Sequence, residues 1–188
     1  MMYFAVFLVL FVLELIYFKI ADRFNIIDKP NHRSSHTQIT LRGGGIIFPI
    51  AFVLYFVLSA AYRKDYFLPE DYWSFGLGLF LLSTISFLDD ILDLSSKLRL
   101  LFHFVAVTLL IYFLGLFTSA PIWFIPLVYV FVIGVLNAYN FMDGINGITG
   151  VYSLVMFIPF YYLNQYGVTF TDAHFIISPI LASLVFLF

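Results

Sequence analysis

The segment Ile122–Gly147 reads IWFIPLVYVFVIGVLNAYNFMDGING and joins an apolar run long enough to cross a bilayer to a polar end. A second apolar run, Ile148–Asn164, follows directly. Placing Asn137, Asn140 and Asp143 next to lipid is costly unless these side chains face a polar site. The segment therefore predicts a membrane-spanning helix that brings a polar cluster to the membrane surface.

The composition of the whole chain points the same way. The 188 residues are 63% hydrophobic and only 11% charged, which is far more apolar than a soluble domain. A net charge of −2 gives no argument for nucleic-acid binding, so we expect no nucleic-acid partner. The absence of cysteine excludes disulfides and thiolate metal sites. We expect an all-α, polytopic integral membrane protein.

Seven apolar runs are candidate membrane-spanning helices, since about 20 mostly apolar residues cross a bilayer. They are Tyr3–Ile20, Gly45–Tyr62, Tyr72–Leu88, Leu98–Phe117, Ile122–Asn140, Ile148–Asn164 and His174–Phe188. The last run is short and no basic residue closes it. We therefore expect residues 1–188 to form a single transmembrane domain that is truncated at its C-terminus, with the seventh helix cut short.

The connections between these runs differ in charge. Of the nine lysines and arginines, seven lie in or beside the connections 21–44, 89–97 and 141–147, and two lie in the connection 63–71. The positive-inside rule then places the first three connections in the cytoplasm and the N-terminus outside. Every polar cluster of interest falls on the cytoplasmic face, which a purely structural membrane protein does not need.

Three carboxylates follow the third apolar run, at Asp89, Asp90 and Asp93. Carboxylates this close repel one another unless a cation or a proton intervenes. The pattern predicts either a Mg²⁺–diphosphate site or a base that deprotonates a phosphate. Lys97 and Arg99 are suited to phosphate oxygens, whereas a solvated acidic helix end would not need them.

The polar residues at the end of Ile122–Gly147 are spaced three positions apart. Asn137, Asn140 and Asp143 therefore share one broad face if the helix continues that far. Amide and carboxylate oxygens are ligands for hard metal ions, and amides also recognise nucleotides. A helix cap explains Gly147 well, but it does not explain three polar side chains in register.

The first cytoplasmic connection is basic and ends in three glycines. Arg33 and Arg42 can pair with phosphate, and glycines that open a helix can expose backbone N–H groups to an anion. Basic cytoplasmic loops are common, so this signal is weak by itself. His32 has no carboxylate partner nearby in sequence, and the isolated His103 and His174 are interpreted as packed or interfacial rather than catalytic.

Three stretches together resemble the polyprenyl-phosphate N-acetylhexosamine-1-phosphate transferases, which include the phospho-MurNAc-pentapeptide transferase of peptidoglycan synthesis. The stretches are Pro30-Asn-His-Arg-Ser-Ser-His36 with Arg42-Gly-Gly-Gly45, then Phe87-Leu-Asp-Asp-Ile-Leu-Asp93, then Asn137–Gly147. The resemblance covers essentially all of this chain, but only the N-terminal part of a family member.

The resemblance implies an enzyme that transfers a sugar 1-phosphate from a UDP-N-acetylhexosamine to undecaprenyl phosphate and releases UMP. This is the first lipid-linked step of O-antigen, capsule or other cell-envelope polysaccharide synthesis, including lipopolysaccharide. It implies Mg²⁺, with Mn²⁺ as a substitute, and an active site on the cytoplasmic face of the inner (plasma) membrane. A homodimer is allowed but not required.

The resemblance also assigns roles to residues. It implies Asp89 and Asp90 as catalytic carboxylates, and Asn140 and Asp143 as metal ligands. The substrate-binding residues that it implies are Arg33, His36, Arg42, Asp93, Lys97, Asn137 and Asp143.

Two features depart from the family pattern. Ile39 and Leu41 stand where proline is common, and the later Gly-Asp-x-Gly-Ser motif with its metal-binding aspartate is absent from these residues. We therefore expect residues 1–188 alone to show little transferase activity.

Other readings stay open at this point. A UbiA-like membrane prenyltransferase also holds Mg²⁺ with Asp-rich motifs, but it should have two of them, whereas the second cluster here is rich in asparagine and glycine. A transporter should carry ionisable residues at mid-membrane on several helices. A non-catalytic remnant is the third alternative.

Overall fold

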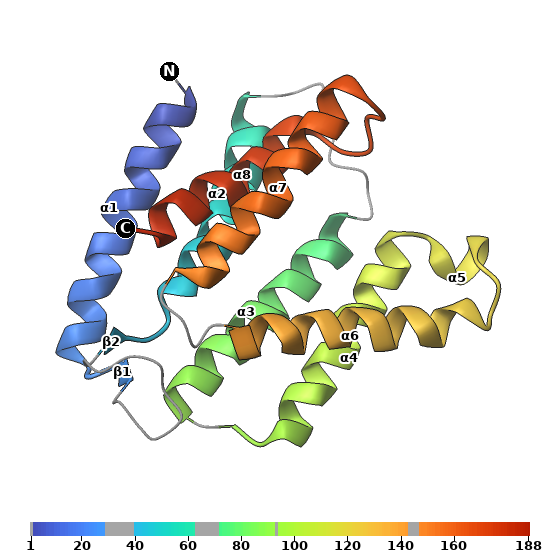
Figure 1. Ribbon diagram of the computed structural model, residues 1–188, viewed down its shortest axis with the longest axis horizontal. Coiled ribbons are helices and arrows are strands. Elements are labelled where there is room, and N and C mark those ends of the chain that lie inside the picture. The colour runs from blue at the N-terminus through green and yellow to red at the C-terminus, as the bar shows by residue number, and fades with distance from the viewer. Residues whose placement is uncertain (1, 29–39, 63–71, 93, 143–146) are drawn as a thin grey trace. The chain divides into compact units, whose positions relative to one another are not determined.

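The computed structural model describes residues 2–28, 40–62, 72–92, 94–142 and 147–188. Within these ranges the chain is helical apart from one two-stranded hairpin (Figure 1). The elements are α1 (Met2–Arg23), β1 (Ile27–Asp28), β2 (Thr40–Leu41), η1 (Gly44–Ile46), α2 (Ile47–Tyr62), α3 (Tyr72–Leu92), α4 (Ser96–Phe113), α5 (Leu116–Ser119), α6 (Phe124–Met142), α7 (Ile148–Tyr166) and α8 (Ala173–Phe186). The all-α prediction is confirmed.

Five of the described helical segments are long and apolar enough to cross a membrane. They are α1, the continuous η1–α2 segment, α3, α4 and α6, and α8 is a shorter apolar helix. Helix α7 has 19 residues but lies outside this set, because its C-terminal half carries tyrosine, asparagine and glutamine. The structure therefore supports a multi-span membrane protein with five clear candidate spans.

The predicted span Leu98–Phe117 is too long at its C-terminal end. Helix α4 ends at Phe113, and Gly115 takes a left-handed conformation with φ of 64° before the short helix α5 begins. A left-handed glycine just past the last helical turn is a common helix terminator, because glycine has no Cβ to clash there. The glycine therefore divides what the apolar composition suggested was one continuous helix.

The described contacts divide the chain into two compact units. The first unit comprises Met1–Lys64 and Met142–Phe188, and the second comprises Asp65–Phe141. In the first unit, α8 packs against α1, α2 and α7 (Figure 1). Its core is formed by one residue of α1, two of α2 and two of α8: Leu10, Ile47, Ala51, Ala182 and Val185.

Two close contacts hold α7 and α8 together. A Cβ added to Gly150 would lie 2.8 Å from side-chain atoms of Leu187, so a larger residue here would force that side chain to move. At the other end, the buried Asn164 side chain accepts hydrogen bonds from the backbone N–H groups of Phe170 and Thr171 and donates to the carbonyl of Thr171. A buried amide whose oxygen and nitrogen both have backbone partners fixes the turn between the two helices.

A small hairpin follows α1 and leads to α2. Strand β1 pairs with β2 in antiparallel register, with Ile27 opposite Leu41. The N–H of Arg42 then donates to the carbonyl of Ile26 at 3.0 Å, and Gly43 turns the chain with a φ of 82°. The glycines that were expected to open a helix do so, because η1 and α2 begin directly after this turn.

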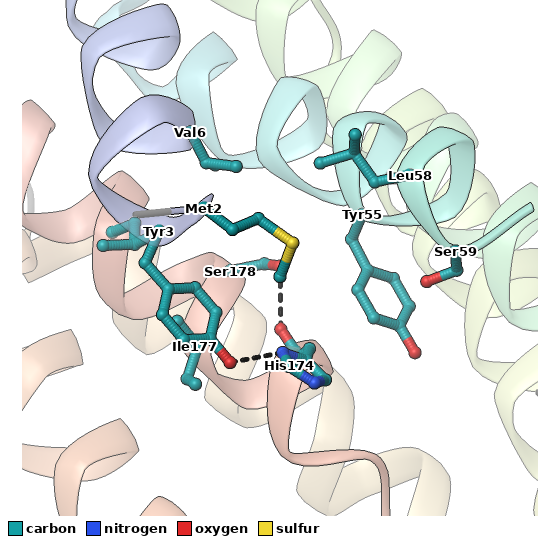
Figure 2. A pocket seen from close by; sticks show the side chains of 10 residues that line it. Met2, Tyr3, Val6, Tyr55, Leu58, Ser59, His174, Ile177 and Ser178 are labelled. Atoms are coloured by element: carbon teal, nitrogen blue, oxygen red, sulfur yellow. Dashed lines mark hydrogen bonds between the residues drawn. The ribbon is translucent and has the colours of Figure 1, made fainter. Parts of the chain in front are cut away.

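A pocket lies between the N-terminal end of α1, the C-terminal part of α2 and α8 (Figure 2). The Tyr3 hydroxyl hydrogen-bonds Nδ1 of His174, and the carbonyl of His174 accepts a hydrogen bond from Ser178. His174 thus connects α8 to α1, which agrees with its interpretation as a packing residue. The pocket is mainly apolar and lined by Met2, Tyr3, Val6, Tyr55, Leu58, Ser59, His174, Ile177, Ser178 and Leu181.

The second unit is built on an antiparallel pair, α3 and α4. A Cβ on Gly78 of α3 would lie 3.3 Å from the carbonyl oxygen of Ala106 on α4, so the two helices approach closely at this point. Helix α6 is joined to α4 through Tyr129, whose ring stacks on Phe104 with centroids 4.5 Å apart and whose hydroxyl lies 2.7 Å from Oγ1 of Thr108. None of the residues of α6 is buried.

Candidate functional site at the α3–α4 turn

The two predicted catalytic carboxylates lie in the last turn of α3. Helix α3 continues to Leu92, so Asp89 and Asp90 sit at its C-terminal end. This is an unfavourable place for a negative charge, because the helix dipole leaves partial negative charge on the terminal carbonyl groups. Carboxylates here need nearby positive charge or N–H donors to compensate.

Asp89 receives both kinds of compensation. Its Oδ2 forms an ion pair with Nη1 of Arg99 at 2.8 Å, and its Oδ1 accepts a hydrogen bond from the backbone N–H of Leu94 at 3.0 Å. The two side chains are partly shielded, with 19% of Asp89 and 30% of Arg99 exposed. Asp89 therefore closes the turn between α3 and α4, in addition to any chemical role.

Arg99 is a functional candidate that the sequence only partly indicated. Its basic character suggested a phosphate partner, but in the structure its guanidinium holds Asp89. The spacing of ten residues between Asp89 and Arg99 has no helical meaning, because the chain turns between them. Only the α3–α4 turn reveals this pair.

Asp90 and Lys97 complete the charged groups at this turn. Both side chains are exposed, Asp90 at the end of α3 and Lys97 in the first turn of α4. Helix α4 begins with Ser95 as its N-cap, whose hydroxyl accepts from the N–H of Leu98. Two carboxylates and two cations thus gather on one short turn, a set suited to phosphate chemistry.

The asparagines of the opening segment are helical, as expected. Helix α6 continues to Met142, so Asn137 and Asn140 lie in its last turns. The half-buried Asn137 donates from Nδ2 to the carbonyl of Ile133 at 2.9 Å, while Asn140 is exposed. Gly147 takes a φ of 79° at the N-cap position of α7, which confirms its interpretation as a helix cap.

Several predicted site residues lie outside the described ranges. They are Arg33, His36, Asp93 and Asp143. Arg42 is described and half-buried, with its backbone held on both sides by hydrogen bonds. Arg42 belongs to the first unit, whereas Asp89, Asp90, Lys97, Asn137 and Asn140 belong to the second.

The polar side chains of the site include possible ligands for a divalent metal ion. Within the described ranges, no three histidine, cysteine, aspartate or glutamate side chains form a group able to hold a metal ion. Mg²⁺ does not need such a group, because it usually keeps several waters and binds one or two carboxylates together with substrate phosphates. The exposed oxygens of Asp90 and Asn140 are of the hard type that Mg²⁺ prefers, so the chemistry of the donors fits this ion.

His103 is buried on α4, one helical turn beyond Arg99. Its interpretation as a packed histidine is confirmed by an exposure of 7%. Its Nδ1 atom has no hydrogen-bond partner among the described residues. No feature of the sequence indicated this.

The chain is similar to a known protein family over more than half of its length. A family model described as Glycosyl transferase family 4 matches residues 72–188, which include α3, α4, α6, α7 and α8. The chain is 28% identical over 149 residues to a Bacillus subtilis (strain 168) protein named "Probable undecaprenyl-phosphate N-acetylglucosaminyl 1-phosphate transferase", a match that covers 73% of this chain and 40% of the relative.

A second relative has a similar name and a similar degree of identity. The chain is 27% identical over 141 residues to the "Undecaprenyl-phosphate alpha-N-acetylglucosaminyl 1-phosphate transferase" of Thermotoga maritima, covering 71% of this chain and 42% of the relative. The chain therefore matches less than half the length of either curated relative. From the family match over α3 to α8, the chain belongs to Glycosyl transferase family 4, the polyprenyl-phosphate N-acetylhexosamine-1-phosphate transferases.

Proposed function

We propose that the gene product transfers a sugar 1-phosphate from a UDP-N-acetylhexosamine to undecaprenyl phosphate and releases UMP. The reaction would start a lipid-linked cell-envelope polysaccharide such as an O-antigen or a capsule. The observation that carries the proposal is the α3–α4 turn, where Asp89, Asp90, Lys97 and Arg99 gather within the part of the chain that the family model matches. The names of both relatives support undecaprenyl phosphate as the acceptor.

The proposed reaction exchanges one diphosphate bond for another. An oxygen of the lipid phosphate attacks the phosphorus that carries the sugar, the bond from this phosphorus to the UMP oxygen breaks, and UMP leaves with the bonding electrons. Such transfers depend on positioning and on neutralising oxygen charge. Lys97 supplies positive charge on an exposed side chain, and Asp90 is the carboxylate that would accept a proton from the lipid phosphate.

The proposed role of Asp89 is structural, whereas that of Asp90 is to accept a proton. Because Oδ1 and Oδ2 of Asp89 each have a donor, its role is to hold the α3–α4 turn and to keep Arg99 beside the site. Mg²⁺ would neutralise charge on the diphosphate oxygens, and within the second unit Asn140 offers an oxygen ligand for it.

The test is UMP release from UDP-N-acetylglucosamine in membranes that contain the complete gene product and undecaprenyl phosphate. We expect Asp90→Asn to lower the rate by roughly 100-fold, the scale seen when a key electrostatic group is removed. Asp22→Asn is the matched control, because Asp22 is an exposed carboxylate at the end of α1 outside the proposed site. Equal rates for Asp90→Asn and the unmodified protein would refute the role of Asp90.

The proposal also includes an orientation, with the N-terminus outside and the α3–α4 turn in the cytoplasm. These 188 residues contain no cysteine, so single cysteines can report the side of the membrane once any cysteine elsewhere in the gene product is replaced. A membrane-impermeant maleimide should label Val168→Cys in intact cells and should label Ser96→Cys only after the cells are opened. Both positions are exposed. The reverse pattern would overturn the orientation.

A further inference from the structure

Glu14 occupies a core position of the apolar helix α1. The buried residues of this helix are Leu10, Glu14, Tyr17 and Ala21, and steps of four, three and four residues place them on one face. Only 2% of Glu14 is exposed. Apolar side chains normally fill such a face, so a carboxyl group in the middle of it needs a physical explanation.

The carboxyl group of Glu14 lies against the glycine turn that leads into α2. Its Oε1 atom lies 3.1 Å from the position that a Cβ on Gly44 would occupy, and a ring atom of Phe186 on α8 lies 3.5 Å from the same position. The Oε2 atom is buried and has no hydrogen-bond partner among the described residues. The carboxyl group is therefore packed where α1, α8 and this turn meet.

The titratable groups on the elements packed against α1 do not compensate a charge on Glu14. The hydroxyl of Tyr17 donates its hydrogen to the carbonyl oxygen of Arg42 at 2.5 Å. Arg42 is the cation nearest to the glycine turn in the chain, and it forms no ion pair with Glu14 in the described structure. Tyr55 of α2 and His174 of α8 border the pocket at the N-terminal end of α1.

A charged carboxylate at this place would be costly. Removing an ion from water costs several kcal/mol even after the protein relaxes, and only a close cation or several hydrogen-bond donors offset that cost. A buried ionisable group without such partners changes its protonation state instead. The packing of Glu14 therefore favours the uncharged carboxylic acid.

We propose that Glu14 is a proton-binding site that controls the packing of α1. The bound proton keeps the side chain uncharged and packed against Gly44, and loss of this proton to water releases α1 from the turn, because the carboxylate must then reach water. The inference is independent of the proposed transfer reaction, since every contact that it uses lies in the first unit. The first unit would thus respond to alkaline pH without any contact with substrate.

Infrared spectroscopy of the complete gene product tests the protonation state of Glu14 directly. A protonated carboxyl group has a carbonyl stretching band that an ionised carboxylate lacks. At neutral pH the unmodified protein should show such a band, and Glu14→Gln should lack it. Asp22→Asn is the matched control, because Asp22 is an exposed carboxylate on the same helix that is ionised at this pH, so its removal should leave the band unchanged.

Cysteine labelling tests the release of α1, once any cysteine elsewhere in the gene product is replaced. Ala21 lies on the same buried face and is 0% exposed, so a maleimide should label Ala21→Cys slowly at neutral pH. The rate is divided by that of the exposed Ser96→Cys, which corrects for the general increase in thiolate with pH. This relative rate should rise by up to about tenfold per pH unit where Glu14 loses its proton, because one proton is linked to the opening.

Two further backgrounds separate the proton of Glu14 from other effects of alkaline pH. In Glu14→Gln the relative labelling rate of Ala21→Cys should stay constant within about 2-fold, since the amide has no proton to lose. In Tyr17→Phe the pH response should remain. This second result excludes ionisation of the neighbouring phenol, whose ordinary pKa is about 10.

Either measurement can overturn the proposal. If Glu14→Gln removes no carboxylic acid band, Glu14 is charged in the packed state and the proton site is wrong. If the relative labelling rate of Ala21→Cys is independent of pH, or rises equally in Glu14→Gln, the proton does not control α1. Neither measurement uses UMP release, so a failure of the proposed function leaves both results interpretable.

Discussion

Asp89 and Glu14 are carboxylates on apolar helices, and they differ in burial and in hydrogen-bond partners. Asp89 lies at a helix end, where Arg99 and the N–H of Leu94 each bind one of its oxygens. Glu14 lies within a span, almost fully buried, and its Oε2 has no hydrogen-bond partner among the described residues. The contrast teaches that the partners of a carboxylate, rather than its burial, indicate whether it stabilises the fold.

Asn164 adds a third polar side chain to the comparison, and its substitution is expected to have the largest effect on stability. It is as buried as Glu14, with 2% exposed, but its amide makes three hydrogen bonds to the α7–α8 turn. Asn164→Ala should lower the free energy of unfolding by about 3 kcal/mol, because the backbone groups it serves lose their partners. Thermal unfolding in detergent measures this.

The neighbouring Gln165 provides the control for that substitution. It is exposed on the same helix and makes one long hydrogen bond to Tyr161 at 3.3 Å. Gln165→Ala should therefore change stability by less than about 0.5 kcal/mol. Similar losses for the two alanine variants would show that the Asn164 hydrogen bonds do not hold the turn.

Asp89→Ala is expected to have the next largest effect on stability. It removes the acceptor for Leu94 and leaves Arg99 beside a helix end without its anion, a loss of about 1–2 kcal/mol for this partly exposed pair. Measuring the free energy of unfolding of Asp89→Ala, Arg99→Ala and the double variant gives the interaction free energy between the two side chains. The double variant should be more stable than the sum of the single losses predicts, and strict additivity would contradict a direct pair.

The Asp89–Arg99 pair should also respond to salt. Because both side chains are partly exposed, dissolved ions screen their attraction. The stability difference between the unmodified protein and Arg99→Gln should shrink by a few tenths of a kcal/mol between low salt and about 1 M NaCl. Tyr162→Phe, which changes no charge, should show the same difference at both salt concentrations.

Glu14→Gln is expected to have the smallest effect. The amide has nearly the same shape as the carboxyl group, so its contact with Gly44 is kept, and a neutral group is less costly to bury. The free energy of unfolding should change by less than about 0.5 kcal/mol. A loss as large as that of Asp89→Ala would show that the Glu14 carboxylate has an ionic partner and would end the contrast.

Much of the candidate site could be predicted from local sequence. The run of apolar residues before Asp89 determines that α3 is a helix, and the three-residue step places Asn137 and Asn140 on neighbouring turns of α6. The left-handed Gly147 also follows from local rules, because glycine adopts this conformation without strain. The break at Gly115 was missed because apolar composition alone does not locate a helix end.

The sequence by itself indicated five of the membrane spans, the polar clusters between them and the family, because each depends on neighbouring residues or on the order of motifs. The tertiary structure decided which side chains meet: Arg99 with Asp89 across a turn, and Tyr17 with Arg42 across 25 residues. It also decided that Glu14 lies against Gly44. The physical reason is that helical periodicity is a local property, whereas the partner of a side chain depends on how distant segments pack.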